Sequence, residues 1–98
     1  MITNIHRARD GRKIIAVCDK ELLGKKFKEK DRQLDLSSKF YKGKELDDDN
    51  LKKLLKTAYI INAAGEKTTN FLIKNKIIQK ENIIYIENIP HAQCLLIE

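Results

Sequence analysis

An Asp10-Gly11 pair between two β-prone runs is the feature that most constrains the fold of this chain. The runs cover residues Ile2–Ala8 and Lys13–Cys18. Asp-Gly between such runs indicates a hairpin, because glycine accepts the positive φ of a tight turn. The sequence therefore predicts a two-stranded start. If Asp10 and Gly11 alone form the loop, the alternation of strand side chains places His6 and Cys18 on opposite faces of the hairpin.

Two amphipathic helices are expected in the second half of the chain. Asp47 opens a run in which apolar residues recur at helical spacing from Leu51 to Ala58. Its acidic side chains stand at the end that carries the positive pole of the helix dipole. A second helix is expected from Glu66 to about Lys76, burying apolar residues on one face.

The other expected elements are short strands and turns. Alternation of apolar and polar residues predicts strands at Lys25–Lys30, Gln33–Ser37, Asn82–Glu87 and Ala92–Ile97, and an aromatic-anchored turn at Phe40–Gly43. Residues 59–61 form either a buried strand or the apolar continuation of the first helix. Small residues at 62–65 are expected to break the pattern, and Pro90 to separate the last two strands.

Residues 1–98 are expected to form one α+β domain, with a mixed sheet that starts with the N-terminal hairpin and two helices packed on it. Every unbroken apolar stretch is far shorter than the ~20 residues that cross a bilayer, so no transmembrane segment is expected. Cys18 and Cys94 lie inside apolar runs, and the first residues show no charged and then hydrophobic leader. These features favour a reducing cytoplasm.

The charge excess lies in one half of the chain. Residues 1–44 contain 13 Lys and Arg against six Asp and Glu, whereas residues 45–98 contain seven against eight. A one-sided basic field attracts polyanions, so the expected partner is RNA or a ribonucleoprotein. Nine residues on the hairpin tip and the following strand would bind phosphates: Arg7, Arg9, Arg12, Lys13, Lys25, Lys26, Lys28, Lys30 and Arg32. The alternative is a solvated lysine-rich face, since only four of the 20 basic residues are Arg.

The candidates for catalysis are Cys18, Asp19, Glu66 and His91. A histidine directly after proline would be presented rigidly to a ligand, and it titrates near neutral pH; the alternative is a histidine that fixes the turn. A Cys18 thiolate with His91 as its base requires the two side chains to lie within hydrogen-bond reach. We favour a buried Cys18 beside a turn-capping Asp19, because free cysteine is among the most buried residue types.

Four side chains make up the ligand set of a zinc site: His6, Cys18, His91 and Cys94. Structural zinc needs convergent ligands, whereas His6 and Cys18 are expected on opposite faces of the hairpin. No metal and no cofactor are therefore expected.

Residues 62–66 place small side chains before the second helix, where free N–H groups can receive a phosphate or carboxylate. Asn62 and Gly65, together with His91 and Gln93, are thus candidate ligand-binding residues. Glu66 would repel an anion at this position, and small residues also let a helix pack closely on a sheet. We favour packing as the role of this segment.

Four blocks of the sequence resemble one family. They are Ala16-Val17-Cys18-Asp19 with Leu23-Gly24-Lys25, then Phe40-Tyr41-Lys42-Gly43, then Asn62-Ala63-Ala64-Gly65-Glu66, and finally Ile89-Pro90-His91-Ala92-Gln93. In order and spacing they are similar to the archaeal domain-of-unknown-function family number four-two-four, over almost the whole chain. The resemblance implies a small archaeal cytoplasmic domain. It implies no reaction, cofactor or substrate.

These observations predict a non-enzymatic RNA- or ribonucleoprotein-associated domain that binds phosphates through residues 7–13 and 25–32. His91 and Gln93 would contribute a second contact surface.

Two alternatives stay open. One is a small enzyme or ligand-binding domain with a polar site around Asp19, Asn62, Glu66 and His91, which requires four separated segments to converge. The other is a homodimer or complex subunit that pairs through an edge strand at Ala92–Ile97.

Overall fold

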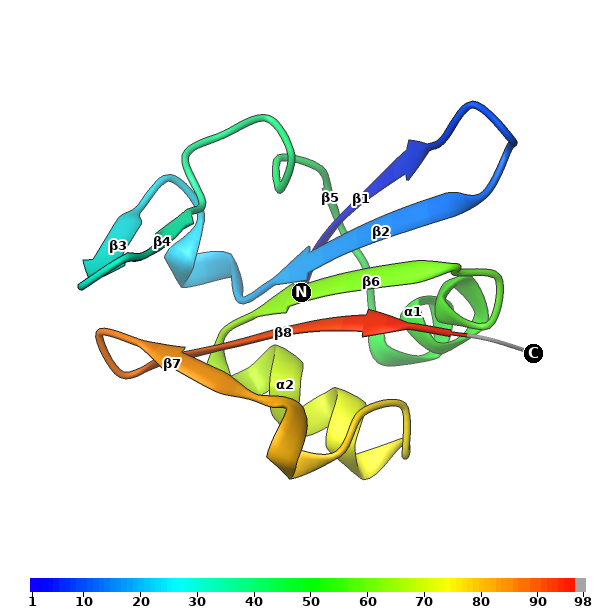
Figure 1. The fold of residues 1–98 in the computed structure, drawn as a ribbon. Coiled ribbons are helices and arrows are strands. Elements are labelled where there is room, and N and C mark those ends of the chain that lie inside the picture. The colour runs from blue at the N-terminus through cyan, green and yellow to red at the C-terminus, as the bar shows by residue number, and fades with distance from the viewer. Residues whose placement is uncertain (97–98) are drawn as a thin grey trace.

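A six-stranded mixed sheet forms the centre of the computed structural model, which describes residues 1–96 (Figure 1). Its strand order is β5-β1-β2-β6-β8-β7, and a separate hairpin, β3-β4, lies beside one end of it. The strands are β1 (Ile2–Arg7), β2 (Lys13–Cys18), β3 (Lys26–Glu29), β4 (Arg32–Asp35), β5 (Lys44–Glu45), β6 (Ile60–Ala64), β7 (Ile84–Ile86) and β8 (Ile89–Leu95). The helices are α1 (Asp48–Leu55) and α2 (Glu66–Lys74), with 3-10 turns η1 (Lys20–Leu22) and η2 (Lys80–Asn82). The α+β class, the N-terminal hairpin and the two helices are thus confirmed. No helix among residues 1–96 has the length and apolar character needed to cross a membrane.

The loop of the β1-β2 hairpin is longer than the Asp-Gly pair alone indicates. Residues 8–12 form the turn, and a backbone hydrogen bond of 2.9 Å joins its first and last residues. In the resulting register Ile2 lies opposite Cys18. Strand alternation then places Ile2, His6 and Cys18 on the same face, because a shift of one residue moves every side chain of a strand to the other face. The predicted separation of His6 from Cys18 across the hairpin is therefore wrong.

Strand β6 continues beyond residue 61, where the sequence predicts a break. It pairs in parallel with β2 and antiparallel with β8, so residues 59–61 lead into a strand and do not continue α1. The predicted break at Asn62 is wrong. Ala63 and Ala64 are buried, and their small side chains fit a strand that is covered on both faces. The direction of the chain changes at Gly65, whose φ is 108°.

Pro90 lies inside β8 and does not separate two strands. The turn between β7 and β8 is formed by Glu87 and Asn88, whose φ values are 49° and 67°. The proline carbonyl accepts a hydrogen bond of 2.9 Å from the backbone N–H of Gly65, the residue that follows β6. The missing N–H of Pro90 therefore faces the point where its neighbouring strand ends, so no hydrogen bond of the sheet is lost.

Strand β8 pairs with β7 only over Ile89–His91. Residues 92–95 pair with β6 on one side, and no strand among residues 1–96 pairs with their other side. Pairing of two copies through this stretch stays a prediction. Ile97, the predicted end of the strand, lies outside the described residues.

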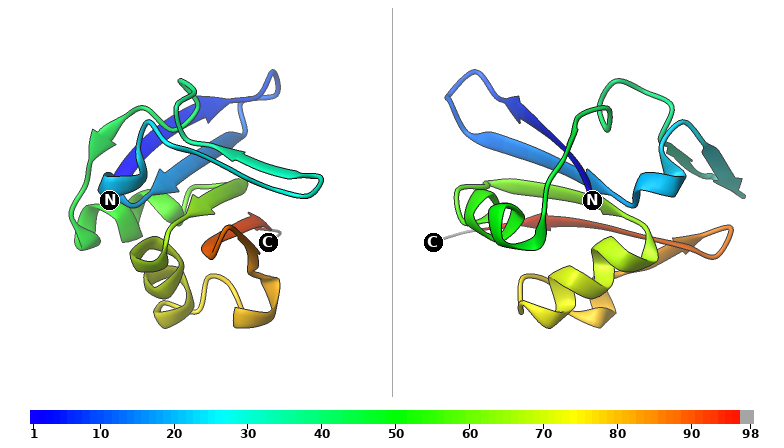
Figure 2. Two further views of the ribbon diagram at one scale, coloured as in Figure 1. Left: turned by 90° about the vertical axis from the view of Figure 1, so that its left-hand side faces the viewer. Right: turned by 180° about the vertical axis from the view of Figure 1, so that it is seen from behind.

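The two faces of the sheet carry different cores. Both helices cover one face, where Leu51, Leu55 and Leu72 pack against apolar residues of β2 and β6 (Figure 2). On the opposite face, Leu36 and Tyr41 belong to a second core with residues of β3, β4 and the Cys18 end of β2. The remainder of this second face is only half-buried or exposed along β6 and β8, at Ile60, Asn62, His91, Gln93 and Leu95. We call its three polar residues, Asn62, His91 and Gln93, the open face.

Candidate functional site

The nine predicted phosphate-binding residues form two separate groups. The tip group is Arg7, Arg9, Arg12 and Lys13 on the β1-β2 hairpin, and the β3-β4 group is Lys25, Lys26, Lys28, Lys30 and Arg32. All are exposed except Lys13, which is half-buried. Backbone hydrogen bonds join Lys13 of the tip hairpin to Tyr59, and Tyr59 to Leu96, which directly follows β8. By contrast, Lys28 of β3 is hydrogen-bonded to Glu87, which lies just before β8. The seven residues of β8 place these points roughly 20 Å apart.

Figures 1 and 2 show the two hairpins at opposite ends of the molecule. The nine residues therefore do not form one contiguous surface. Each group has to be considered by itself.

Asp10 reduces the charge of the tip group. The Arg12 Nε lies 3.1 Å from the Asp10 carboxylate, and both side chains are exposed. The same carboxylate accepts a hydrogen bond of 3.1 Å from the Arg12 backbone N–H and so shapes the turn. Exposed ion pairs contribute at most about 1 kcal/mol, so Arg12 is available to another anion at low cost.

A groove beside the tip group combines cations with an aromatic ring. Its volume is about 490 Å³, and it is lined by Gly11, Arg12, Lys13, Lys56, Thr57, Ala58, Tyr59 and Leu96. We call it the tip groove. The Arg12 guanidinium lies over the Tyr59 ring, 4.3 Å from its centroid, and Lys13 Nζ donates to Thr57 Oγ1 at 3.3 Å. None of its lining residues within positions 1–96 is Asp or Glu.

Sequence reasoning missed Lys56 and Tyr59 because they belong to the half of the chain without excess charge. The backbone N–H of Tyr59 donates to the Lys13 carbonyl at 2.9 Å, which places the start of β6 beside the tip. This contact extends the parallel pairing of β2 with β6, a long-range feature with no local signal in the sequence.

Two glutamates hold the β3-β4 group in place. Glu87 accepts a hydrogen bond of 2.8 Å from the Lys28 backbone N–H, and Glu29 accepts one of 3.1 Å from the Glu87 backbone N–H. Phe27 and Leu34 pack into the core beneath the hairpin. The five cations of this group alternate with carboxylates at positions 29, 31 and 35, so its net charge is lower than its Lys content indicates.

His91 is half-buried on the open face. Its Nδ1 lies 2.9 Å from the Ala63 carbonyl oxygen, so the ring is held by β6. Burial lowers the pKa of His91, and the hydrogen bond with Ala63 offsets part of that effect. The neighbouring Asn62 and Gln93 lie opposite each other in the β6-β8 register, so their side chains share this face. The open face therefore presents two amides and one imidazole.

Asp19 is buried, and its carboxylate caps helix α2. It accepts hydrogen bonds from the backbone N–H groups of Lys67 (3.0 Å) and Thr68 (2.8 Å), and from the Thr68 hydroxyl (2.7 Å). These are the donors that an external phosphate or carboxylate would use at the start of the helix. An internal carboxylate thus occupies the position that the sequence indicates for an anion beside Asn62 and Gly65.

The four polar residues of the enzyme alternative do not line one pocket. Asp19 and exposed Glu66 border a cavity of about 390 Å³ that also contains Lys67, Asn70 and Pro90, but neither Asn62 nor His91 lines it. The Asp19 carboxylate is already engaged with α2. This arrangement lacks the convergence that the enzyme alternative requires.

Cys18 is fully buried, and its side chain belongs to the core. Burial, with a smaller effect from Asp19, raises the pKa of the Cys18 thiol to about 11. Ala64 lies between Cys18 and His91 in the sheet, so these two residues are two strands apart, roughly 10 Å. A thiolate with His91 as its base is therefore out of reach.

The zinc set is dispersed as well. His6 and Cys18 share a face, but the register places them four residues apart along the β1-β2 hairpin. Among residues 1–96, no three His, Cys, Asp or Glu side chains come together in a way that could hold a metal ion. Cys18 and Cys94 are free thiols.

Together these features define a small α+β domain with a mixed sheet, two helices on one face of it and a basic hairpin at each end of the molecule. The sequence profile described as "Protein of unknown function (DUF424)" matches residues 6–97, and the chain belongs to this family. The family suggested by the four sequence blocks is thereby confirmed.

A solved structure supports the same assignment. It is described as "Crystal structure of an uncharacterized conserved protein from Methanopyrus kandleri", and it is similar to this chain with a TM-score of 0.80 and 30% sequence identity. The match covers 99% of this chain and 93% of that chain. Comparison with curated proteins finds no match.

Proposed function

We propose that this domain is a non-enzymatic RNA- or ribonucleoprotein-associated protein that binds phosphates at both basic hairpins. The tip groove carries the argument. Arg12, Lys13 and Lys56 line it, with Asp10 paired to Arg12 outside the lining, and the Arg12 guanidinium lies over the flat ring of Tyr59. Lysine and arginine contacts to phosphates release counterions and supply most of the affinity in sequence-independent binding.

The open face gives this proposal a second contact surface, on the side of the sheet opposite the helices. Asn62 and Gln93 supply amide donors and acceptors, and His91 supplies a ring nitrogen beside them. Such groups bind base edges or ribose hydroxyls of single-stranded RNA. In this arrangement the cations position the strand and the open face contacts its bases, as residues 7–13, 25–32, 91 and 93 were expected to do.

The test measures binding of a fluorescent single-stranded RNA against salt concentration for three double variants. Lys13→Glu/Lys56→Glu alters the tip groove, Lys26→Glu/Lys28→Glu alters the β3-β4 group, and Lys53→Glu/Lys74→Glu is the control on the helices. Each variant changes the net charge by the same amount. We expect the first two to weaken binding at least about tenfold and to lower the salt slope by about 1 to 2, because each lost phosphate contact removes about one unit or less.

The control variant should lose much less affinity, because its lysines lie outside both groups. Equal losses in all three variants would indicate only a response to net charge. That result, or binding that is insensitive to salt, would contradict the proposal.

A further inference from the structure

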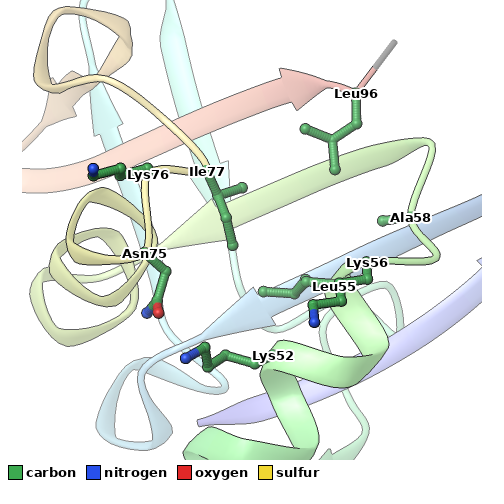
Figure 3. Close-up of a pocket in the computed structure, with 8 residues that line it drawn as sticks. All are labelled: Lys52, Leu55, Lys56, Ala58, Asn75, Lys76, Ile77 and Leu96. Atoms are coloured by element: carbon green, nitrogen blue, oxygen red, sulfur yellow. The ribbon is translucent and has the colours of Figure 1, made fainter. Parts of the chain in front are cut away.

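A second cavity lies between the end of α1 and the loop after α2 (Figure 3). Its volume is about 380 Å³, within the range of about 300–1,000 Å³ that is typical of small-molecule sites. Leu55 and Ala58 are buried in its floor, and half-buried Ile77 and Leu96 form its walls. In Figure 3 these four apolar side chains surround the cavity, and the Lys52 side chain extends from α1 toward the loop that carries Asn75.

Three exposed lysines border the cavity: Lys52, Lys56 and Lys76. No Asp or Glu is among the described residues that line it. The cavity also lies at the C-terminal ends of both helices, each of which carries about −0.5 of an elementary charge. Among the described residues, three ammonium groups outweigh these two dipoles and give the opening a net charge of about +2.

The loop after α2 is held in a defined shape at this place. Asn75 Nδ2 donates to the Phe71 carbonyl at 2.8 Å, and Lys76 follows with a φ of 60° in the left-handed region. The backbone N–H groups of Ile77 and Ile78 both bond to the Leu72 carbonyl, at 2.9 and 3.4 Å. These contacts position Lys76 and Ile77 at the cavity before any ligand is present.

We propose that this cavity binds a small carboxylate with an aliphatic body, the carboxylate at the lysines and the aliphatic part against Leu55, Ala58, Ile77 and Leu96. The charge selects an anion, and the apolar lining selects a body without polar groups. No aromatic side chain lines the cavity, so a flat ring has no stacking partner there. This cavity shares Lys56, Ala58 and Leu96 with the tip groove, so the variant that tests it alters Lys52 and Lys76, which lie outside the tip groove.

The test uses the full chain, labelled with 15N, and titrates it with sodium octanoate while backbone amide shifts are recorded. Octylamine, which has the same body and the opposite charge, is titrated in parallel. We expect saturable shifts centred on Leu55, Ala58, Ile77 and Leu96 with octanoate, and binding at least tenfold weaker with octylamine. The variant Lys52→Gln/Lys76→Gln should bind octanoate about fivefold more weakly, since it loses two of the three ammonium groups and each exposed ion pair contributes little.

Lys67→Gln/Lys80→Gln is the matched control, because both lysines are exposed and lie outside this cavity. It should bind octanoate as the unaltered chain does. Both variants change surface lysines only, so a dispersed amide spectrum is expected and verifies the fold in the same experiment. Shifts that map elsewhere, the absence of saturation, equal binding of octylamine, or equal loss in the control would each overturn the proposal.

Discussion

The carboxylate of Asp19 lies in the space that a side chain at Gly65 would need. A Cβ at position 65 would stand 2.6 Å from each of the two carboxylate oxygens, and the residue has a φ of 108°. The cap of α2 therefore comes from a residue 48 positions before Lys67, its bonding partner, and not from the residue that precedes the helix. Asp19 and Gly65 thus connect the end of β2 to the start of α2. Their close approach joins the two sequence blocks that contain positions 19 and 65.

Gly65→Ala should destabilise the domain by about 3 kcal/mol, because the added methyl group displaces a buried carboxylate and strains the backbone. Gly24→Ala is the matched control. Gly24 also has a positive φ, 90°, but no atom lies within 4 Å of its Cβ position, so only the backbone strain of about 1 kcal/mol applies. Urea unfolding of both variants measures the difference, and equal costs would contradict the role given to Asp19.

Asp19→Ala should cost about 2–4 kcal/mol of unfolding free energy. Its removal leaves two backbone N–H groups and the Thr68 hydroxyl without their acceptor in a buried place. Asp47→Ala removes the exposed cap of α1, where water replaces the lost acceptor, and should cost about 1 kcal/mol. Chemical denaturation of the two variants, with circular dichroism as the signal, ranks these losses; a larger loss for Asp47 would be the contrary result.

The pH dependence of stability should contain a contribution from His91. Burial lowers its pKa in the folded state, so between that value and about 6.5 the unfolded chain holds the extra proton. The unfolding free energy therefore falls as the pH falls through this window. Above the window His91 is neutral in both states, and its contribution to the unfolding free energy no longer changes with pH. His91→Gln should flatten the dependence just below pH 6.5. Unfolding at pH 8 gives the pH-independent cost of the substitution, and an unchanged slope at lower pH would exclude His91 as the source.

The two thiols should differ in reactivity. Cys18 is fully buried and its pKa is raised to about 11, so very little thiolate forms at neutral pH. Burial also raises the pKa of Cys94, but its side chain is partly accessible. With a disulfide reagent at pH 7.5, the Cys94→Ser variant should react at least about tenfold more slowly than Cys18→Ser. In guanidinium chloride the two rates should converge, and rapid reaction of native Cys18 would show that the core opens there.

Local signals in the sequence predict most of the secondary structure. The Asp-Gly turn, the acidic start at Asp47 and the alternation around Phe27 each act within a few residues, and the corresponding elements are present. The errors arise where distant contacts decide. The turn closes over five residues, Asn62 continues a strand because β2 and β8 lie on its two sides, and Pro90 fits within β8 because β6 ends beside it.

The same distinction between local signals and long-range contacts applies to the candidate site. The basic residues of the tip and of β3-β4 are visible in the sequence, whereas their separation depends on the position of each hairpin relative to β8. Lys56 and Tyr59 join the tip groove only through the parallel contact with Lys13. The free N–H groups at the start of α2 can be predicted from the sequence, whereas their acceptor, the carboxylate of Asp19, comes from a distant part of the same molecule.

The hydrogen bonds of Glu87 with Lys28 and with Glu29 fix the β3-β4 hairpin to the sheet, so the spacing of the two basic groups is a constant of the folded chain. The longest dimension of the molecule is 34 Å. Under the proposed RNA binding, a short oligonucleotide would contact one group at a time, while a longer one would bridge both and gain the second contact at a high effective concentration. Affinity should therefore rise steeply at one threshold of oligonucleotide length and change little beyond it.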